Sequence, residues 1–109
     1  MKKYILILDL VNDEKLISEY INYHKAIPLA IKNSIFESGI TSMEIYRFQD
    51  RLVMEIYANE DFSFERKNEL DMNNSQVIAW EKLMSTFQKS IPGTPENVKW
   101  VLAENIFKL

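Results

Sequence analysis

Two stretches of alternating side chains near the middle of the chain place the strongest constraint on its fold. Residues 43–48 and residues 52–57 both show a period of two, and the short polar segment Gln49-Asp50 separates them. Such a period is typical of β-strands, and two alternating runs around a tight turn form an antiparallel hairpin. The chain is therefore expected to contain an antiparallel sheet.

A strand and an interrupted helix are predicted before this hairpin. Residues 4–10 are apolar and rich in β-favouring side chains, which predicts a buried strand. Asn12 precedes two acidic residues and is expected to cap a helix, in which apolar residues recur at helical spacing up to Ile35. Pro28 should break this helix, and Gly39 should end the helical region in a left-handed conformation.

Two helices and a strand are predicted after the hairpin. Asp61 is expected to cap a short charged helix that extends to Leu70, and a longer helix should begin near Asn73 or Asn74. The apolar positions of the longer helix, residues 77, 80, 84 and 87, are three and four apart. Two prolines and a glycine predict a loop over residues 90–99, and residues 100–107 predict a last strand.

The order of these elements predicts the fold class. Strand, helix, two strands, helices and strand form the α+β, ferredoxin-like (βαββαβ) plan, an antiparallel sheet with helices on one face. Aromatic residues at 46, 57, 100 and 107 would leave the other face of the sheet apolar. A second copy packed sheet to sheet would cover it, so we expect a homodimer, with a cavity between the sheet and the helices.

Composition excludes several classes of function. The 109 residues suit a single domain, residues 1–109, and the net charge of −3 without a basic stripe argues against nucleic-acid binding. The apolar run at the N-terminus is too short to cross a membrane and leads to no cleavage site, so no membrane partner is expected. The absence of cysteine favours a cytoplasmic location. The chain has no cysteine, one histidine and two glycines, which argues against a metal centre and a phosphate-binding loop. Any reaction should therefore be a proton transfer that uses no cofactor.

Three groups of residues could carry such chemistry. Tyr20 and His24 are four apart and share one helical face. On spacing alone, this pair is more often structural, with His24 bonded to a backbone carbonyl. Glu44 and Tyr46 share one face of a strand, which could point inward or toward solvent.

The third group is the Trp80-Glu81 dipeptide. Trp80 belongs to the apolar stripe of its helix, where most tryptophans are core residues, and Glu81 flanks it. A tryptophan beside a carboxylate is also a common arrangement for binding a sugar, since the ring can stack on the sugar and the carboxylate can accept hydrogen bonds from hydroxyl groups. As a dipeptide alone it is a weak signal.

Together these stretches resemble one family. The order and spacing of EYINYHKAIP, GITSMEIYRFQDRLVM, VIAWEKLMSTFQ and KWVLAENIFKL are similar to those of the L-rhamnose mutarotase family, especially its L-fucose mutarotase-like branch. The resemblance extends from Lys3 to Leu109. It implies a dimeric α/β barrel of ferredoxin-like subunits that interconverts the α and β anomers of a deoxy-L-hexose, L-fucose or L-rhamnose, without a cofactor.

The resemblance also implies roles for single residues. His24 would be the proton donor, and Tyr20, Trp80 and Glu81 would contact the sugar. The chain differs from the rhamnose enzymes at Met43, where they have a substrate-contacting tyrosine, at Glu81, where they have a second tryptophan, and at Ile27-Pro28, where they have Trp-Pro. These differences leave the identity of the sugar open.

Anomer exchange needs only an acid and a base. An acid protonates the ring oxygen, a base takes the anomeric proton, the C1–O5 bond breaks, and the ring closes again after the aldehyde rotates. Histidine, with an ordinary pKa of about 6.5, suits the acid, and Tyr20 would orient it or the sugar. Glu44, Tyr46 and Glu81 are candidates for the base or for hydroxyl ligands, while Trp80 would stack on the face with the C6 methyl group.

Two other functions fit the same fold. A ferredoxin-like dimer with a cavity could bind a sugar or another ligand without catalysis. It could also be a cofactor-free monooxygenase, which would consume oxygen and act on an aromatic substrate. A polar cavity would favour a sugar over a polycyclic aromatic compound.

Overall fold

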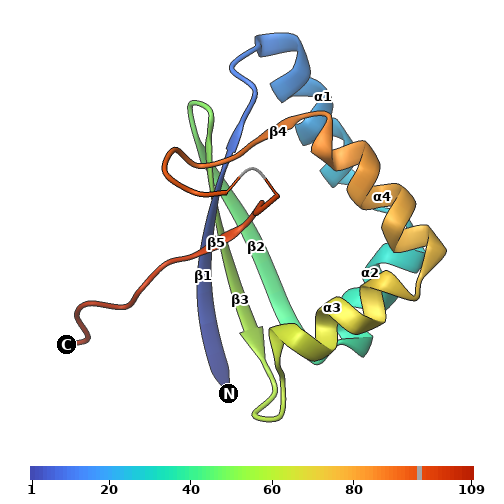
Figure 1. Cartoon of the computed structure of the whole chain (residues 1–109), viewed down its shortest axis with the longest axis vertical. Helices are drawn as coiled ribbons and strands as arrows, with labels where there is room; N and C mark the ends of the chain where they lie inside the picture. Colours follow the sequence, from blue (N-terminus) through green and yellow to red (C-terminus); the bar gives the residue numbers. More distant parts are fainter. Residues whose placement is uncertain (96) are drawn as a thin grey trace.

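The chain folds into one sheet covered on one face by helices. The computed structural model describes residues 1–95 and 97–109. Its elements, in chain order, are β1 (Lys2–Leu10), α1 (Glu14–Lys25), α2 (Leu29–Glu37), β2 (Ile40–Phe48), β3 (Arg51–Ala58), α3 (Phe64–Met72), α4 (Ser75–Ser85), β4 (Gln88–Lys89) and β5 (Val101–Leu102). The helices form an arc on one side of the sheet (Figure 1). The predicted α+β, ferredoxin-like architecture is confirmed.

The sheet is antiparallel and open. The strand order is β2-β3-β1-β4, and β5 also pairs with β1. β1 and β3 pair along almost their full lengths, from Lys2 with Ala58 to Asp9 with Arg51. The sheet of a single chain is not closed into a barrel (Figure 1).

The predicted hairpin and helix break are both present. Phe48 pairs with Arg51, so the turn is at Gln49-Asp50, where Gln49 takes a φ of 53° in place of a glycine. Pro28 separates α1 from α2 and stands at the N-terminus of α2, where a missing N–H group costs nothing. Gly39 has a φ of 102° and connects α2 to β2.

Several predicted boundaries were wrong. The N-cap of α1 is Asp13 rather than Asn12, and that of α3 is Ser63 rather than Asp61; each side chain accepts a hydrogen bond from a backbone N–H in the first turn. The N-cap of α4 is Asn74, one of the two residues near which this helix was predicted to begin. The strand predicted over residues 100–107 is only Val101–Leu102, and beyond it the chain leads away from the sheet (Figure 1).

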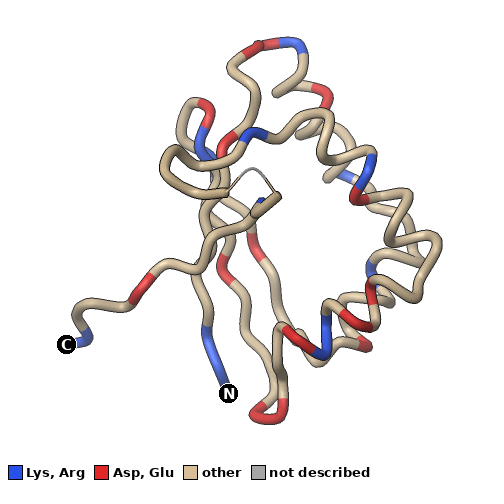
Figure 2. Tube along the Cα trace, in the orientation of Figure 1, with Lys and Arg blue, Asp and Glu red and all other residues tan. Residues whose placement is uncertain are grey.

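Charged residues are spread over both layers. Figure 2 shows acidic and basic residues at separate positions along strands, helices and turns rather than gathered in one basic segment. In the described residues, no helix is long and apolar enough to cross a membrane.

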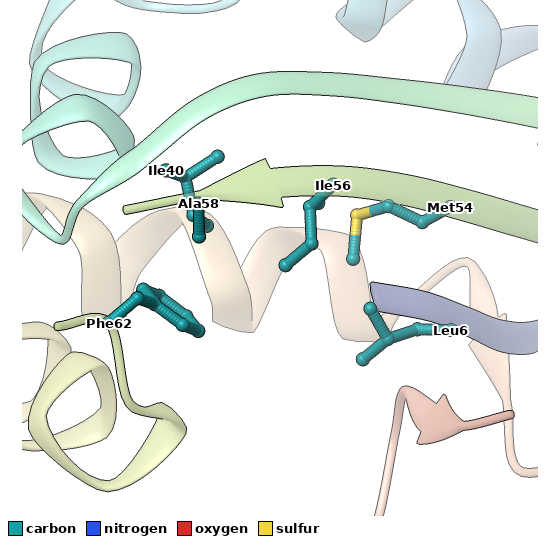
Figure 3. Close-up of a cluster of buried hydrophobic side chains, with 6 residues drawn as sticks. All are labelled: Leu6, Ile40, Met54, Ile56, Ala58 and Phe62. Atoms are coloured by element: carbon teal, nitrogen blue, oxygen red, sulfur yellow. The ribbon is translucent and has the colours of Figure 1, made fainter. Parts of the chain in front are cut away.

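The core consists of two apolar clusters on the helix-covered face of the sheet. The first, shown in Figure 3, contains Leu6, Ile40, Met54, Ile56, Ala58 and Phe62. The second contains Leu10, Tyr20, Leu52, Met84 and Phe87. Trp100 and Ile45 pack against both clusters, so these two side chains connect the two halves of the core.

Replacing Phe62 with alanine tests the first cluster. Phe62 is 2% exposed and packs against Tyr4 and Phe64 at the start of α3. Phe62→Ala should lower the free energy of unfolding by about 3–5 kcal/mol, because it removes a buried ring and leaves a cavity. Urea denaturation measures this change.

Phe36→Ala is the matched control, because Phe36 is 54% exposed. It should change the free energy of unfolding by less than about 0.5 kcal/mol. Equal losses in the two variants would contradict the described core.

Candidate active site

A cavity lies between the inner face of the sheet and the helices. Its volume is about 160 Å³, and residues of both core clusters line it. A dry cavity of roughly this size in another protein holds a benzene molecule, so a six-membered ring fits. The polar residues of its wall are Tyr20, His24, Ser34, Lys67, Asp71, Glu81 and Gln88.

His24 lies between two aromatic rings in the last turn of α1. Its ring centroid is 4.4 Å from that of Tyr20 and 5.8 Å from that of Trp80. Its Nδ1 is 2.8 Å from the backbone carbonyl oxygen of Tyr20. A carbonyl oxygen can only accept a hydrogen bond, so Nδ1 must carry a proton. Nε2 is therefore the nitrogen that can give or take a proton in the cavity.

Tyr20 is held with its phenol in the core. The residue is 3% exposed, and Nε2 of Gln88 donates a hydrogen bond of 3.4 Å to its hydroxyl oxygen. Burial raises the pKa of the Tyr20 phenol; the bond from Gln88 lowers it and the charge of Glu81 raises it further. The phenol thus keeps its proton at neutral pH and can donate it to an oxygen of a ligand.

Trp80 and Glu81 reach the cavity from α4. Trp80 is partly buried, and its ring lies edge-on to those of His24 and Tyr23. Glu81 is exposed as a whole residue, yet burial of its carboxyl group against the cavity wall raises the pKa of that group. Lys67 lowers this pKa and Asp71 raises it. The cavity therefore contains a carboxyl group that holds its proton more tightly than usual.

The strand residues divide between the two faces of the sheet. Met43 lines the cavity with Ile45, because these residues pair with the buried Ile56 and Met54. Alternation then places Glu44 and Tyr46 on the outer face, where both are exposed. The alternative that they point inward is wrong.

Glu44 and Tyr46 do lie close together on that outer face. The charge of Glu44 raises the pKa of the Tyr46 phenol. In a single chain, Glu44 and Tyr46 therefore interact with each other, while His24 lies on the opposite side of the sheet.

Sequence reasoning missed four polar residues of the cavity, which are Ser34, Lys67, Asp71 and Gln88. Gln88 belongs to β4, a two-residue strand with too few positions to show a pattern. Lys67 and Asp71 belong to a helix whose opposite charges four apart are typical of a solvent-exposed face. Within residues 1–95 and 97–109, no cluster of three or more His, Asp or Glu side chains could hold a metal ion.

The raised pKa of Glu81 predicts a pH-dependent effect of Glu81→Gln on stability. The folded protein disfavours the ionised carboxyl group, whereas the unfolded chain does not. The wild type should therefore lose stability relative to Glu81→Gln as the pH rises through the ordinary carboxyl pKa, until the raised pKa is passed. Urea denaturation at pH 4 and pH 7.5 checks this, with Glu69→Gln, a change of an exposed glutamate in α3, as the control. A stability difference that is the same at both pH values would contradict the burial of this group.

Comparison with known proteins places the chain in a family. A sequence model described as L-rhamnose mutarotase matches residues 3–109. The L-fucose mutarotase of Xanthomonas campestris pv. campestris is 36% identical over 111 residues, which cover 100% of this chain and 89% of that protein.

Solved structures share the fold. The L-rhamnose mutarotase of Formosa agariphila superposes with a TM-score of 0.73 at 16% identity, covering 100% of this chain and 99% of that one. A dimeric ferredoxin-like protein from an uncultured marine organism gives a TM-score of 0.55 at 15% identity, covering 97% and 91%. The match over almost the entire sequence, the identity to the Xanthomonas protein and the common fold show that the chain belongs to the L-rhamnose mutarotase family, a family of isomerases acting on sugar anomers.

Proposed function

We propose that this chain is a mutarotase that interconverts the α and β anomers of a deoxy-L-hexose. The observation that carries this proposal is the placement of His24. Its Nδ1 donates a hydrogen bond to the carbonyl oxygen of Tyr20, which leaves Nε2 free to exchange a proton. Its ring packs against the rings of Tyr20 and Trp80 in the wall of the cavity. Family membership supplies the reaction.

The residues of the cavity suit the two proton transfers of ring opening. Protonated His24 gives the proton on Nε2 to the ring oxygen O5, while the Glu81 carboxylate takes the proton of the anomeric hydroxyl. The C1–O5 bond breaks, its electron pair stays on O5, and C1 becomes an aldehyde. After rotation about C1–C2, O5 attacks the other face of C1, His24 takes its proton back, and Glu81 returns a proton to the new hydroxyl. Both enzyme groups end as they began.

The other side chains of the cavity hold the sugar. The Tyr20 phenol can donate to a sugar oxygen, and Gln88 keeps that phenol in place. The indole ring of Trp80 offers an apolar surface, and Met43 with Ile45 offers another for the C6 methyl group of a deoxy sugar. L-fucose is the first substrate to test, because the Xanthomonas relative, at 36% identity, is an L-fucose mutarotase. L-rhamnose is the second.

Exchange spectroscopy tests the reaction directly. Catalytic amounts of the protein should produce proton NMR cross-peaks between the α and β anomeric signals of L-fucose or L-rhamnose. His24→Gln should slow this exchange by about 100-fold or more, since a general acid typically contributes 10²–10⁴-fold.

The control is Asn22→Ala, a change on the exposed side of α1, which should exchange the anomers at the wild-type rate. A folded His24→Gln protein with full activity would refute the role of His24. Binding of one anomer by the wild type without faster exchange would favour a non-catalytic sugar-binding module instead.

We also infer that a second copy of the chain covers the outer face of the sheet. This face carries the exposed rings of Tyr46 and Phe48, and the C-terminal segment, which leads away from the sheet, exposes Ile106 and Phe107. The charged pair of Asp9 and Arg51 lies among them, with the Asp9 carboxylate already buried in the single chain. A sheet with exposed aromatic residues on its bare face is stabilised when it packs against another sheet.

Sedimentation equilibrium tests this association. The wild type should sediment at twice the chain mass of 12.9 kDa at micromolar concentration. Phe48→Lys should shift the protein toward the single-chain mass, because it places a charge in the apolar contact. Phe36→Lys, which changes an exposed phenylalanine on α2, is the control and should remain at the wild-type mass. A wild type that sediments as single chains would refute the dimer.

A further inference from the structure

The helix α3 turns two of its charged residues toward the cavity. Phe64, Lys67 and Asp71, which are three and four positions apart, line the cavity wall. The apolar Leu70 and Met72 of the same helix are 43% and 67% exposed. This is the reverse of an ordinary amphipathic helix, whose apolar stripe faces the core. Figure 2 shows acidic and basic residues along this helix.

Lys67 and Asp71 form an ion pair that is partly withdrawn from water. Their Nζ and Oδ2 atoms are 2.6 Å apart, and the two side chains are 24% and 22% exposed. The other charged residues of α3, which are Glu65, Arg66 and Glu69, are all exposed. The pair is thus the part of α3 that the fold covers most.

Packing alone gives no reason for this arrangement. Withdrawing a charge from water costs free energy, and apolar side chains of similar size would fill the same positions at no such cost. Lys67 and Asp71 also act on Glu81 across the cavity wall, because their charges shift the pKa of that carboxyl group in opposite directions. A polar ligand in the cavity would make use of all three charges.

The pair also offers a donor and an acceptor side by side. The ammonium group of Lys67 can only donate hydrogen bonds, and the carboxylate of Asp71 can only accept them. Two neighbouring hydroxyl groups on a pyranose ring need such a combination, since one can present its oxygen and the other its proton. The helix α3 lies at the opposite end of the arc of helices from α1, which carries His24 (Figure 1).

We propose that Lys67 and Asp71 bind two neighbouring hydroxyl groups of the sugar ring, and that they determine which deoxy sugar the cavity accepts. The proposal rests on the proposed function for the presence of a sugar in this cavity. The hydroxyl groups that distinguish L-fucose from L-rhamnose are those at C2 and C4. Any two neighbouring hydroxyl groups of the ring include one of these, so a pair that binds two neighbours can discriminate between the two sugars.

Kinetic measurements on two isosteric variants test the proposal. Lys67→Met and Asp71→Asn should each raise the KM for the preferred sugar by about 10-fold, which is the loss of one charge-assisted hydrogen bond, and change kcat by less than about threefold. The ratio of kcat/KM for L-fucose to that for L-rhamnose should also move toward one. Arg66→Met and Glu69→Gln make the same types of change on the exposed side of α3 and should leave both constants as in the wild type. Unchanged KM values and an unchanged ratio in the cavity variants would overturn the proposal.

A binding experiment separates this proposal from the proposed function. The methyl glycosides of L-fucose and L-rhamnose cannot open their rings, so saturation-transfer NMR with them reports binding without catalysis. If the wild type binds a glycoside but exchanges no anomers, and the two variants bind it more weakly, the proposed reaction fails and the hydroxyl-binding pair stands. If the variants bind it as the wild type does, or the wild type binds neither glycoside, the pair is refuted. Lys67→Gln replaces Lys67→Met if the latter does not fold.

Discussion

The long antiparallel pairing of β1 with β3 is the constraint on which the rest of the structure depends. It fixes which side chains of both strands face the helices, so that Leu6 meets Met54 and Leu8 meets Leu52 on the inner face. The hairpin extends this face to β2, where Met43 and Ile45 follow the same alternation. Because the apolar inner face must be covered, the helices pack over it and enclose the cavity.

The cavity lies where the two halves of the core meet. Each apolar cluster is closely packed, and the cavity between them is lined by residues of both. Four of its ionisable groups are held by the backbone or by neighbouring side chains: His24 by a carbonyl of its own helix, Tyr20 by Gln88, and Lys67 and Asp71 by each other. Groups fixed in this way need little reorganisation when a ligand arrives, which is how preorganised sites favour proton transfer. Burial raises the pKa of Glu81, so the ionised carboxylate lowers the stability of the folded protein relative to the unfolded chain.

Much of the fold follows from local patterns in the sequence. The hairpin, the helix break at Pro28 and the cap at Asn74 depend on residues near one another in the chain, so the sequence contains the information directly. The length of the last strand cannot be predicted from nearby residues, because an apolar segment forms a strand only where the edge of a partner strand is free. At the edge of β1, β5 occupies only the positions beside Leu6 and Ile7.

The site was predictable only in part. The spacing of Tyr20 and His24 and the resemblance to a family pointed to residues that do line the cavity. Alternation assigned Glu44 and Tyr46 to one face but could not say which face, since that depends on how the whole sheet packs. The sequence did not identify Lys67 and Asp71 as cavity residues, because opposite charges four positions apart occur in the same pattern on exposed and on covered helix faces.

The positions of the two tryptophans have an optical consequence. Trp80 and Trp100 are the only tryptophans in the sequence, and both line the cavity. The indole emission of the protein therefore comes entirely from the wall of this cavity. Trp80 in addition lies edge-on to His24, so the emission spectrum reports on changes in the cavity directly beside this histidine.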